Sequence, residues 1–202
     1  YVLAMEELSK VDASVSVCVS VNNSLVCYGL QQFGTEEQKQ KYLKPLAQGK
    51  KDGELHIGAF LLSEPEAGSD ATSQRTTAED KGDHYLLNGT KCFITNASFA
   101  SQFTVFCKVG KPAGNFMACV IVPVPPPALE AIAGGFPTGR EIFLPAGGCI
   151  AVGKPEDKLG QRLSNTAAVT FEEVVVAPEQ IIGDRRRGFQ YVIDVLDYAR
   201  PM

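Results

Sequence analysis

The first fifty residues carry apolar side chains at helical spacing. The spacing is set by Val2, Leu3, Met5, Leu8 and Val11, and it continues to Leu30. Apolar residues that recur near a period of 3.6 predict amphipathic helices. The almost strict alternation from Val15 to Val21 would by itself suit a strand, but the pattern on both sides favours a helix there.

A second helix is predicted to start at Thr35. Thr35 and Gln38 have the spacing of a capping box, in which each side chain binds the backbone amide of the other residue. Tyr42, Leu43 and Leu46 form the apolar side of this helix. A polar loop at residues 49–53 closes the helical region, so we place a first domain at residues 1–52.

From residue 56 onward the pattern changes to short strands separated by turns. Strands are predicted at residues 56–63, 103–109, 117–122, 167–171 and 174–176. Asn88-Gly89 lies between the apolar runs Tyr85–Leu87 and Thr90–Thr95, and this dipeptide is typical of a hairpin turn because it tolerates positive φ. A series of strands with such turns predicts a β-barrel or β-sandwich, which we place at residues 53–182.

Two further segments complete the pattern. Residues 125–149 contain three consecutive prolines and two Gly-Gly pairs, and they predict a long surface loop, unusual inside a compact domain. Helical spacing returns after Gly188, with Phe189, Val192 and Leu196 on one side. The order of helices, strands and helix predicts an α+β protein whose last part begins near residue 183.

Composition excludes several classes of function. The net charge is −4, with 19 basic and 23 acidic residues, which disfavours nucleic acid and other large polyanions as partners. The six cysteines form no CxxC pair and indicate thiols in a reducing compartment. Two histidines leave little material for a zinc site or a serine–histidine triad, so we expect no metal. No apolar run approaches the roughly 18 residues of a membrane span.

Two segments contain residues suited to binding a cofactor. Phe60–Asp70 is a strand that ends in a hydroxyl and turns into Gly68-Ser69, so its backbone amides and Ser69 could hold a phosphate, although an ordinary turn explains the same residues. In Asn88–Asn96, alternation places Phe93 and Thr95 on one face. An aromatic plane beside a hydroxyl could flank a flat heterocycle, and packing in a β core is the alternative.

Several motifs in order resemble the acyl-CoA dehydrogenase family, in particular its short- and medium-chain members of the butyryl-CoA dehydrogenase type. They are YVLAMEELSKVDAS, NNSL, FGTEEQKQKYLKPLAQG, LLSEPEAGSDA, NGTKCFITNA, KPEDKLGQRLSNTA and the final helix that ends in DYAR. The resemblance implies an N-terminal helical domain, a middle β domain and a C-terminal helical bundle, with FAD bound between the last two in a homotetramer. We therefore expect the chain to be a central fragment, with a long insertion at about 125–149 and the start of the bundle at 183–202.

The resemblance also implies site residues. The residues expected to contact FAD are Phe60, Leu61, Leu62, Ser63, Gly68, Ser69, Phe93, Ile94 and Thr95, with Ser63 near the isoalloxazine ring. The residues expected to contact the acyl-CoA are Ser69, Asp197, Tyr198, Ala199 and Arg200. A solvated ion pair is the alternative account of Asp197 and Arg200.

The implied reaction converts an acyl-CoA to a trans-2-enoyl-CoA and passes electrons to an electron-transfer flavoprotein. It needs a glutamate as general base. Most members of the family carry this base further along the chain, and a minority carry it at the position of Ala199. No catalytic base is therefore expected within these residues, and the fragment alone is expected to be inactive.

Some residues depart from the family pattern. Phe93 stands where tryptophan is most common, Glu66 stands where many members have glycine, and Arg185–Arg187 replaces a milder loop. The insertion, Phe93 and Glu66 favour an inactive dehydrogenase-like scaffold as one alternative, and an acyl-CoA oxidase or flavin monooxygenase relative is another. The arginine run is interpreted as a solvated charged surface, with attraction of the CoA phosphates as the alternative. Bacterial cytoplasm and mitochondrial matrix both fit a reducing compartment.

Overall fold

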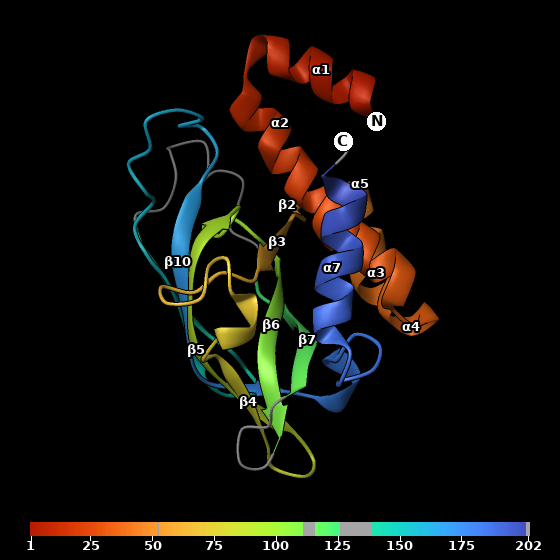
Figure 1. Cartoon of the computed structure of the whole chain (residues 1–202), viewed down its shortest axis with the longest axis vertical. Coiled ribbons are helices and arrows are strands. Elements are labelled where there is room, and N and C mark those ends of the chain that lie inside the picture. The colour runs from red at the N-terminus through yellow and green to blue at the C-terminus, as the bar shows by residue number, and fades with distance from the viewer. Residues whose placement is uncertain (52, 111–115, 126–138, 201–202) are drawn as a thin grey trace.

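The computed structural model describes residues 1–51, 53–110, 116–125 and 139–200. A group of N-terminal helices and the helix α7 (Gly188–Ala199) lie together beside a large sheet (Figure 1). The helical segments before the sheet are α1 (Val2–Val11), α2 (Ala13–Ser20), η1 (Val21–Cys27), α3 (Tyr28–Phe33), α4 (Glu36–Gln38), η2 (Lys39–Leu43) and α5 (Lys44–Gln48). Helices followed by a mixed sheet confirm the predicted α+β class.

The segments α2, η1 and α3 join into one continuous helix, Ala13–Phe33, whose middle part η1 is π-helical. The alternating residues 15–21 are therefore helical. Length and composition alone would let this helix cross a membrane, a test that core helices of soluble proteins also pass. Val26 and Leu30 on this helix are buried in the apolar cluster between helices and sheet, so this part of the helix packs against the sheet.

The capping box predicted at the start of α4 is confirmed. The Gln38 amide donates to Thr35 Oγ1 at 3.2 Å, and the Thr35 amide donates to Gln38 Oε1 at 3.0 Å. The Gln38 side chain also donates to the carbonyls of Glu179 and Ile181, both at 2.8 Å. This buried side chain thus caps its own helix and fastens it to a segment 141 residues further along the chain.

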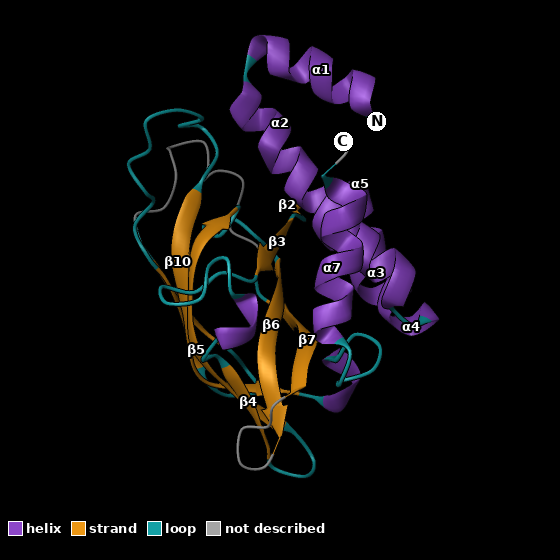
Figure 2. Cartoon of the chain, viewed as in Figure 1, coloured by secondary structure: helices purple, strands orange, loops and turns teal. Residues whose placement is uncertain are grey.

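The main sheet has eight strands in the order β3-β6-β4-β5-β10-β9-β8, and β7 pairs with β6 (Figure 2). The strands are β3 (Gly58–Leu61), β4 (Thr77–Asp80), β5 (Tyr85–Thr95), β6 (Gln102–Gly110), β7 (Phe116–Pro123), β8 (Arg140–Phe143), β9 (Cys149–Val152) and β10 (Thr166–Val176). Short elements add a two-stranded sheet, β1 (Lys50–Lys51) with β2 (Glu54–Leu55), and the 3₁₀ turns η3 (Ala71–Ser73) and η4 (Pro178–Gln180). Strand β6 runs parallel to β3 and β4, and the other pairs are antiparallel.

Strand β3 separates two apolar clusters. Ala59 and Leu61 are fully buried in the cluster formed by the strands. Phe60 and the next apolar residue, Leu62, pack instead against the cluster between sheet and helices, where Phe60 lies against Phe106 with ring centroids 4.9 Å apart. Successive side chains of a strand point to opposite faces, so β3 contributes to both clusters.

The predicted hairpin at Asn88-Gly89 is wrong. Both residues lie inside the continuous strand β5, at a bulge opposite residues 171–174 of β10. Gly89 has φ +145°, and a Cβ there would meet Thr76 Oγ1 at 2.5 Å. Asn88 and Glu173 fill the bulge, with Asn88 Nδ2 donating to Glu173 Oε1 at 2.7 Å and the Glu173 amide donating to Asn88 Oδ1 at 2.8 Å. Positive φ serves a bulge as well as a turn, and the real turn joins β4 to β5 at residues 81–84.

The predicted long loop at residues 125–149 is wrong in part. Residues 140–143 form β8, which pairs with β9 through Ile142 opposite Ile150. Both isoleucines are buried in the strand cluster, and this burial explains why the segment is not a surface loop. Residues 126–138 of the prediction lie outside the described residues.

Candidate functional site

The two segments expected to contact the flavin lie side by side. The Cys92 amide of β5 donates to the Ser63 carbonyl at 3.0 Å, directly after the end of β3. Ser63 and Phe93, which are 30 residues apart in the sequence, are thereby brought to neighbouring positions. The apolar residues before Ser63 anchor this strand end on both faces of the sheet.

Not every expected contact residue can act through its side chain. Leu61 and Ile94 are buried in the strand cluster, with exposed fractions of 0% and 2%, so only their backbone groups can face a ligand. Phe60 and Leu62 are half-buried against the helices. Ser63 and Thr95 are half-buried too, whereas Gly68, Ser69 and Phe93 are exposed.

Phe93 has an unusual backbone and an unusual exposure. Its φ is +58°, in the left-handed region, and its side chain is 69% exposed. The cause is a second bulge, because Lys91 pairs with Val169 and Ile94 pairs with Ala167, so that two residues of β5 oppose Ala168. The bulge breaks the alternation before Phe93, since Lys91 and Ile94 are both buried, whereas Phe93 and Thr95 lie on either side of the buried Ile94, as alternation predicts. Such strained residues persist where the surrounding structure fixes them, often at ligand sites.

Three hydroxyl groups of the segments expected to contact the flavin are unpaired. Among the described residues, the hydroxyls of Ser63, Ser69 and Thr95 form no hydrogen bond with any other group. Asp70 next to Ser69 is occupied differently, since it caps η3 and accepts hydrogen bonds from Thr72 and Ser73. An exposed aromatic ring and unpaired hydroxyls are residue types that fit a flat heterocycle with polar edges and a phosphate.

The unexpected charge at Glu66 is paired. Its carboxylate lies 2.5 Å from the guanidinium of Arg75, and both side chains are largely exposed. Exposed pairs of this kind contribute only about 0–1 kcal/mol to stability. Glu66 therefore brings no unbalanced negative charge to the turn.

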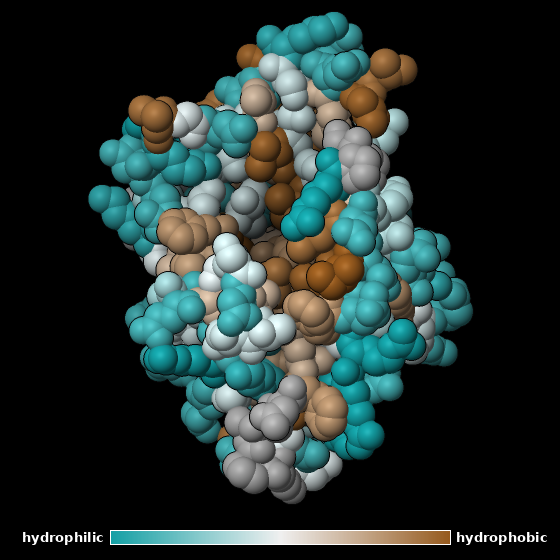
Figure 3. Space-filling model, viewed as in Figure 1, coloured by the Kyte–Doolittle hydropathy of each residue, from teal (hydrophilic) through white to brown (hydrophobic). Residues whose placement is uncertain are grey.

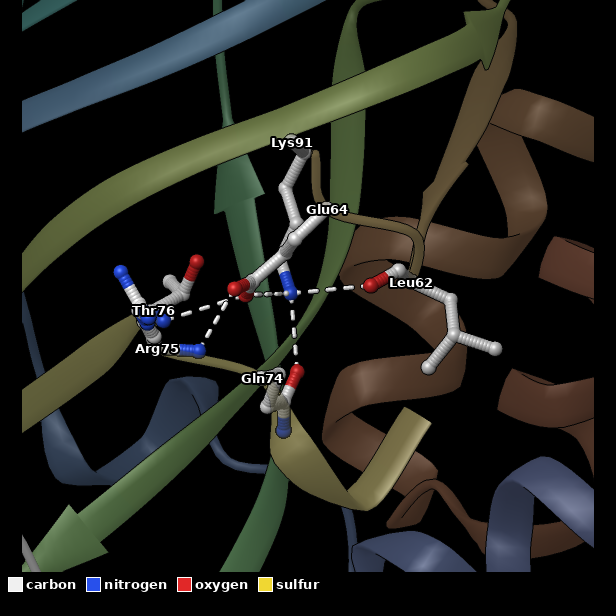
Figure 4. Close-up of polar contacts among 6 residues, drawn as sticks. All are labelled: Leu62, Glu64, Gln74, Arg75, Thr76 and Lys91. Atoms are coloured by element: carbon white, nitrogen blue, oxygen red, sulfur yellow. Dashed lines mark hydrogen bonds and ion pairs between the residues drawn. The ribbon is translucent and has the colours of Figure 1, made fainter. Parts of the chain in front are cut away.

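A buried ion pair under this turn was missed by the sequence reasoning. Lys91 is fully buried, and its Nζ donates to Glu64 Oε1 at 2.7 Å, Gln74 Oε1 at 2.8 Å and the Leu62 carbonyl at 3.1 Å (Figure 4). A signal existed, since Lys91 has the same parity in β5 as the buried Tyr85 and Leu87. An inward lysine in a strand calls for a buried carboxylate.

Glu64 is the partner, and its carboxylate is fully used. Besides Lys91 it accepts hydrogen bonds from the amides of Thr76, at 3.0 Å, and Arg75, at 2.5 Å. Burial raises the pKa of Glu64, but these hydrogen bonds outweigh burial and hold the pKa below its ordinary 4.5. Burial lowers the pKa of Lys91 from 10.5, while the hydrogen bond and charge of Glu64 act in the opposite direction. Glu64 is therefore a carboxylate near neutral pH, and its three hydrogen bonds depend on that form.

The residues expected to contact the substrate lie at the end of α7. The Tyr198 ring stacks on Tyr28 of α3, with centroids 3.6 Å apart. Asp197 and Arg200 are exposed and form no ion pair with each other or with other described residues, so the ion-pair alternative has no support. On this side of the molecule an apolar band runs down a hollowed surface next to α7 (Figure 3).

The basic run before α7 is partly neutralised. Arg185 lies 3.5 Å from Asp80 and donates to the Tyr85 hydroxyl at 3.3 Å, while the Arg186 guanidinium lies over the Phe116 ring at 5.3 Å. These contacts agree with the interpretation of the run as a solvated charged surface. No group of three or more metal-ligating side chains occurs within the part of the chain that the structure describes.

Comparison with known proteins finds family matches over most of the chain. Residues 59–174 match the middle domain of acyl-CoA dehydrogenases, and residues 1–50 match their N-terminal domain. The short-chain specific acyl-CoA dehydrogenase of Clostridium acetobutylicum is 38% identical over 200 residues, which are 99% of this chain and 46% of that protein. The chain thus spans about half the length of the relatives that it matches.

Solved structures give the same result. Butyryl-CoA dehydrogenase from Megasphaera elsdenii superposes with a TM-score of 0.79 at 38% identity, covering 99% of this chain and 46% of that one. A chain in a structure described as the electron transferring flavoprotein of Acidaminococcus fermentans, in work towards a mechanism of flavin-based electron bifurcation, also gives 0.79, at 41% identity and the same coverage. These matches confirm the resemblance that the sequence motifs indicated.

Proposed function

The chain belongs to the acyl-CoA dehydrogenase family, and from this premise we propose that it forms the flavin-binding middle part of an FAD-dependent enzyme. The reaction is the α,β-dehydrogenation of a short-chain acyl-CoA to a trans-2-enoyl-CoA. The names of the relatives in Clostridium acetobutylicum and Megasphaera elsdenii support the short chain. The observation that carries the proposal is the hydrogen bond from the Cys92 amide to the Ser63 carbonyl, which brings Ser63 next to the segment that carries the exposed Phe93 ring.

Each part of the site has a role in this proposal. FAD, when bound, supplies the acceptor for a hydride from the β carbon of the substrate. Ser63 and Thr95 donate to polar edges of the isoalloxazine ring, and Phe93 shields one of its faces from water. Ser69 and the amides of its turn hold phosphate or pantetheine groups. Phe60, Leu61, Leu62, Gly68 and Ile94 complete the cofactor site through backbone groups or partly exposed side chains.

Substrate binding is proposed at the end of α7. Asp197, Tyr198, Ala199 and Arg200 stand at the end of α7, and the unpaired charges of Asp197 and Arg200 leave both groups available to a ligand. The base that removes the α proton is proposed to lie in a part of the protein outside these 202 residues, because Ala199 stands at the alternative position.

The organisation of the whole protein is proposed on the same premise. We place the domain boundaries at 1–52, 53–182 and 183–202, with an insertion at about 125–149. A homotetramer that passes electrons to an electron-transfer flavoprotein is the assembly that we infer, in a bacterial cytoplasm or a mitochondrial matrix. The likeness to a chain from an electron transferring flavoprotein structure supports this partner.

A spectroscopic titration of the purified full-length protein tests the function. We expect flavin absorption bands that bleach when butyryl-CoA is added without oxygen, and that recover when an electron-transfer flavoprotein is added. A protein that cannot be reconstituted with FAD would support the scaffold alternative. Rapid reoxidation by oxygen alone, with peroxide formed, would support the oxidase alternative.

A further inference from the structure

We propose that Lys91 and Glu64 are positioning residues that hold the two flavin-contacting segments in register. The inference rests on the proposed function. Both side chains are buried, with Lys91 0% exposed and Glu64 6% exposed, so their charges cannot contact a ligand or partner at the surface. Figure 4 shows that the lysine comes down from β5 and meets the glutamate from the turn after β3.

The buried pair joins three segments of the chain. The three donors of the Lys91 ammonium go to the strand end at Leu62, to Glu64 and to the Gln74 side chain. The Glu64 carboxylate then accepts from the amides of Arg75 and Thr76. Strand β5, the turn after β3 and the segment before β4 are therefore fastened at one point.

The hydrogen bonds of the pair lie on both sides of Ser63 in the sequence. Leu62 and Glu64, which Lys91 holds, flank Ser63, whose own carbonyl accepts from Cys92. Lys91 also lies two residues before Phe93. The pair thus fixes the backbone on both sides of the predicted flavin contact.

The backbone of Phe93, close to the pair, is strained. Phe93 keeps a left-handed conformation with little side-chain burial to hold it, since its ring is 69% exposed. Strained residues persist only where neighbouring interactions over-determine them. On the N-terminal side of the bulge, these interactions are the pairing of Lys91 with Val169, the hydrogen bonds of the Lys91 side chain, and the bond from the Cys92 amide to the Ser63 carbonyl.

Stability alone does not account for this buried ion pair. A buried ion pair is often no more stabilising than well-packed apolar side chains of similar volume. Hydrogen bonds nevertheless fix direction and distance, which apolar contacts do not. The geometry therefore points to a function in positioning.

The test uses the full-length protein with three variants: Lys91→Met, Glu64→Gln and the double variant. A matched control is Ile150→Ala, which removes a fully buried side chain from β9, two strands away from β5. For each protein we would measure the dissociation constant of FAD, the visible circular dichroism of bound flavin and amide exchange in the FAD-free state. The double variant removes both charges, so it keeps the test open if Lys91→Met alone does not fold.

We expect Lys91→Met and the double variant to weaken FAD binding at least tenfold more than Ile150→Ala, and to change the flavin circular dichroism. Amide exchange should accelerate at residues 62–67 and 92–96 but not in β7. FAD affinity and dichroism equal to those of the control would overturn the positioning role while leaving the proposed function intact. Failure of the unmodified protein to bind FAD would overturn the proposed function and the inference with it.

Discussion

The ring of Tyr28 lies face to face with the ring of Tyr198, with centroids 3.6 Å apart and planes 1° apart. This stack joins the long helix Ala13–Phe33 to the last turn of α7. Asp197 and Arg200, the charged residues proposed to contact the substrate, flank Tyr198 on that turn. The stack thus sets the position of a proposed ligand-binding segment from a helix in the N-terminal part of the chain.

Replacing Tyr28 by leucine should loosen the end of α7. Aromatic pairs contribute about 0.5–1.5 kcal/mol beyond the area that they bury, so we expect the free energy of unfolding to fall by about 1 kcal/mol. The KM for butyryl-CoA should rise in the full-length enzyme, with a smaller effect on kcat. Tyr28→Phe is the matched control, because it keeps the ring and should leave both quantities near their original values. An equal effect of the two substitutions would argue against the stack.

The Glu64 carboxyl should make stability depend on acid pH. Its pKa is lower in the folded protein than its ordinary 4.5, so the unfolded chain takes up the proton more readily. The contribution of Glu64 is full above about pH 4.5 and is lost as the pH falls through the folded-state pKa. Urea unfolding between pH 7 and pH 3 should show this loss, and the Glu64→Gln/Lys91→Met double variant should show less of it. Parallel curves for the two proteins would contradict the expectation.

Gly89→Ala should be strongly destabilising. The new Cβ would lie 2.5 Å from Thr76 Oγ1 and 2.7 Å from Thr76 Cα, on a residue with φ +145°. Overpacking and an unfavourable backbone together cost about 2–4 kcal/mol. Gly160→Ala is the control, since nothing lies within 4 Å of its Cβ position, and it should change stability by less than about 0.5 kcal/mol. Chemical denaturation of both variants makes the comparison, and similar stabilities would refute the close approach.

The parts of the fold that sequence predicted well rest on local rules. The Thr35–Gln38 capping box needs only residues three apart, and α7 and strands β6 and β7 follow from the apolar period of their own segments. Asn88-Gly89 failed as a turn because its preference for positive φ does not distinguish a turn from a bulge. The choice depends on Thr76 and Glu173, which are distant in sequence.

At the candidate site, too, local motifs could be predicted and features set by tertiary contacts could not. Motif resemblance named Ser63 and Phe93 as neighbours of one cofactor, and the fold brings them together. The left-handed backbone of Phe93 could not be predicted, because it arises from the register of β5 on β10. Glu64 and Lys91 were missed because single charged residues are usually solvated, and only tertiary pairing across 27 residues makes their burial possible.

Phe93 offers a test in which stability and cofactor binding move in opposite directions. Glycine relieves the left-handed backbone strain, which is about 1–2 kcal/mol, and this gain exceeds the roughly 0.5–1 kcal/mol that glycine loses through added chain entropy. Because the Phe93 ring is 69% exposed, its removal costs little packing. We therefore expect Phe93→Gly to leave the FAD-free protein as stable as before, or more stable by up to about 1 kcal/mol, while FAD binding weakens.

Phe143→Gly is the matched control for this prediction. Phe143 is 75% exposed on β8, and it does not have a positive φ, so glycine there should cost about 0.5–1 kcal/mol and leave FAD binding unchanged. Phe93→Trp should strengthen FAD binding, because the larger ring offers more stacking area. Urea denaturation of the FAD-free proteins and fluorescence titration with FAD measure the two effects separately. A stability loss at Phe93 equal to that at Phe143, with FAD affinity unchanged, would mean that the strained ring has no part in binding the flavin.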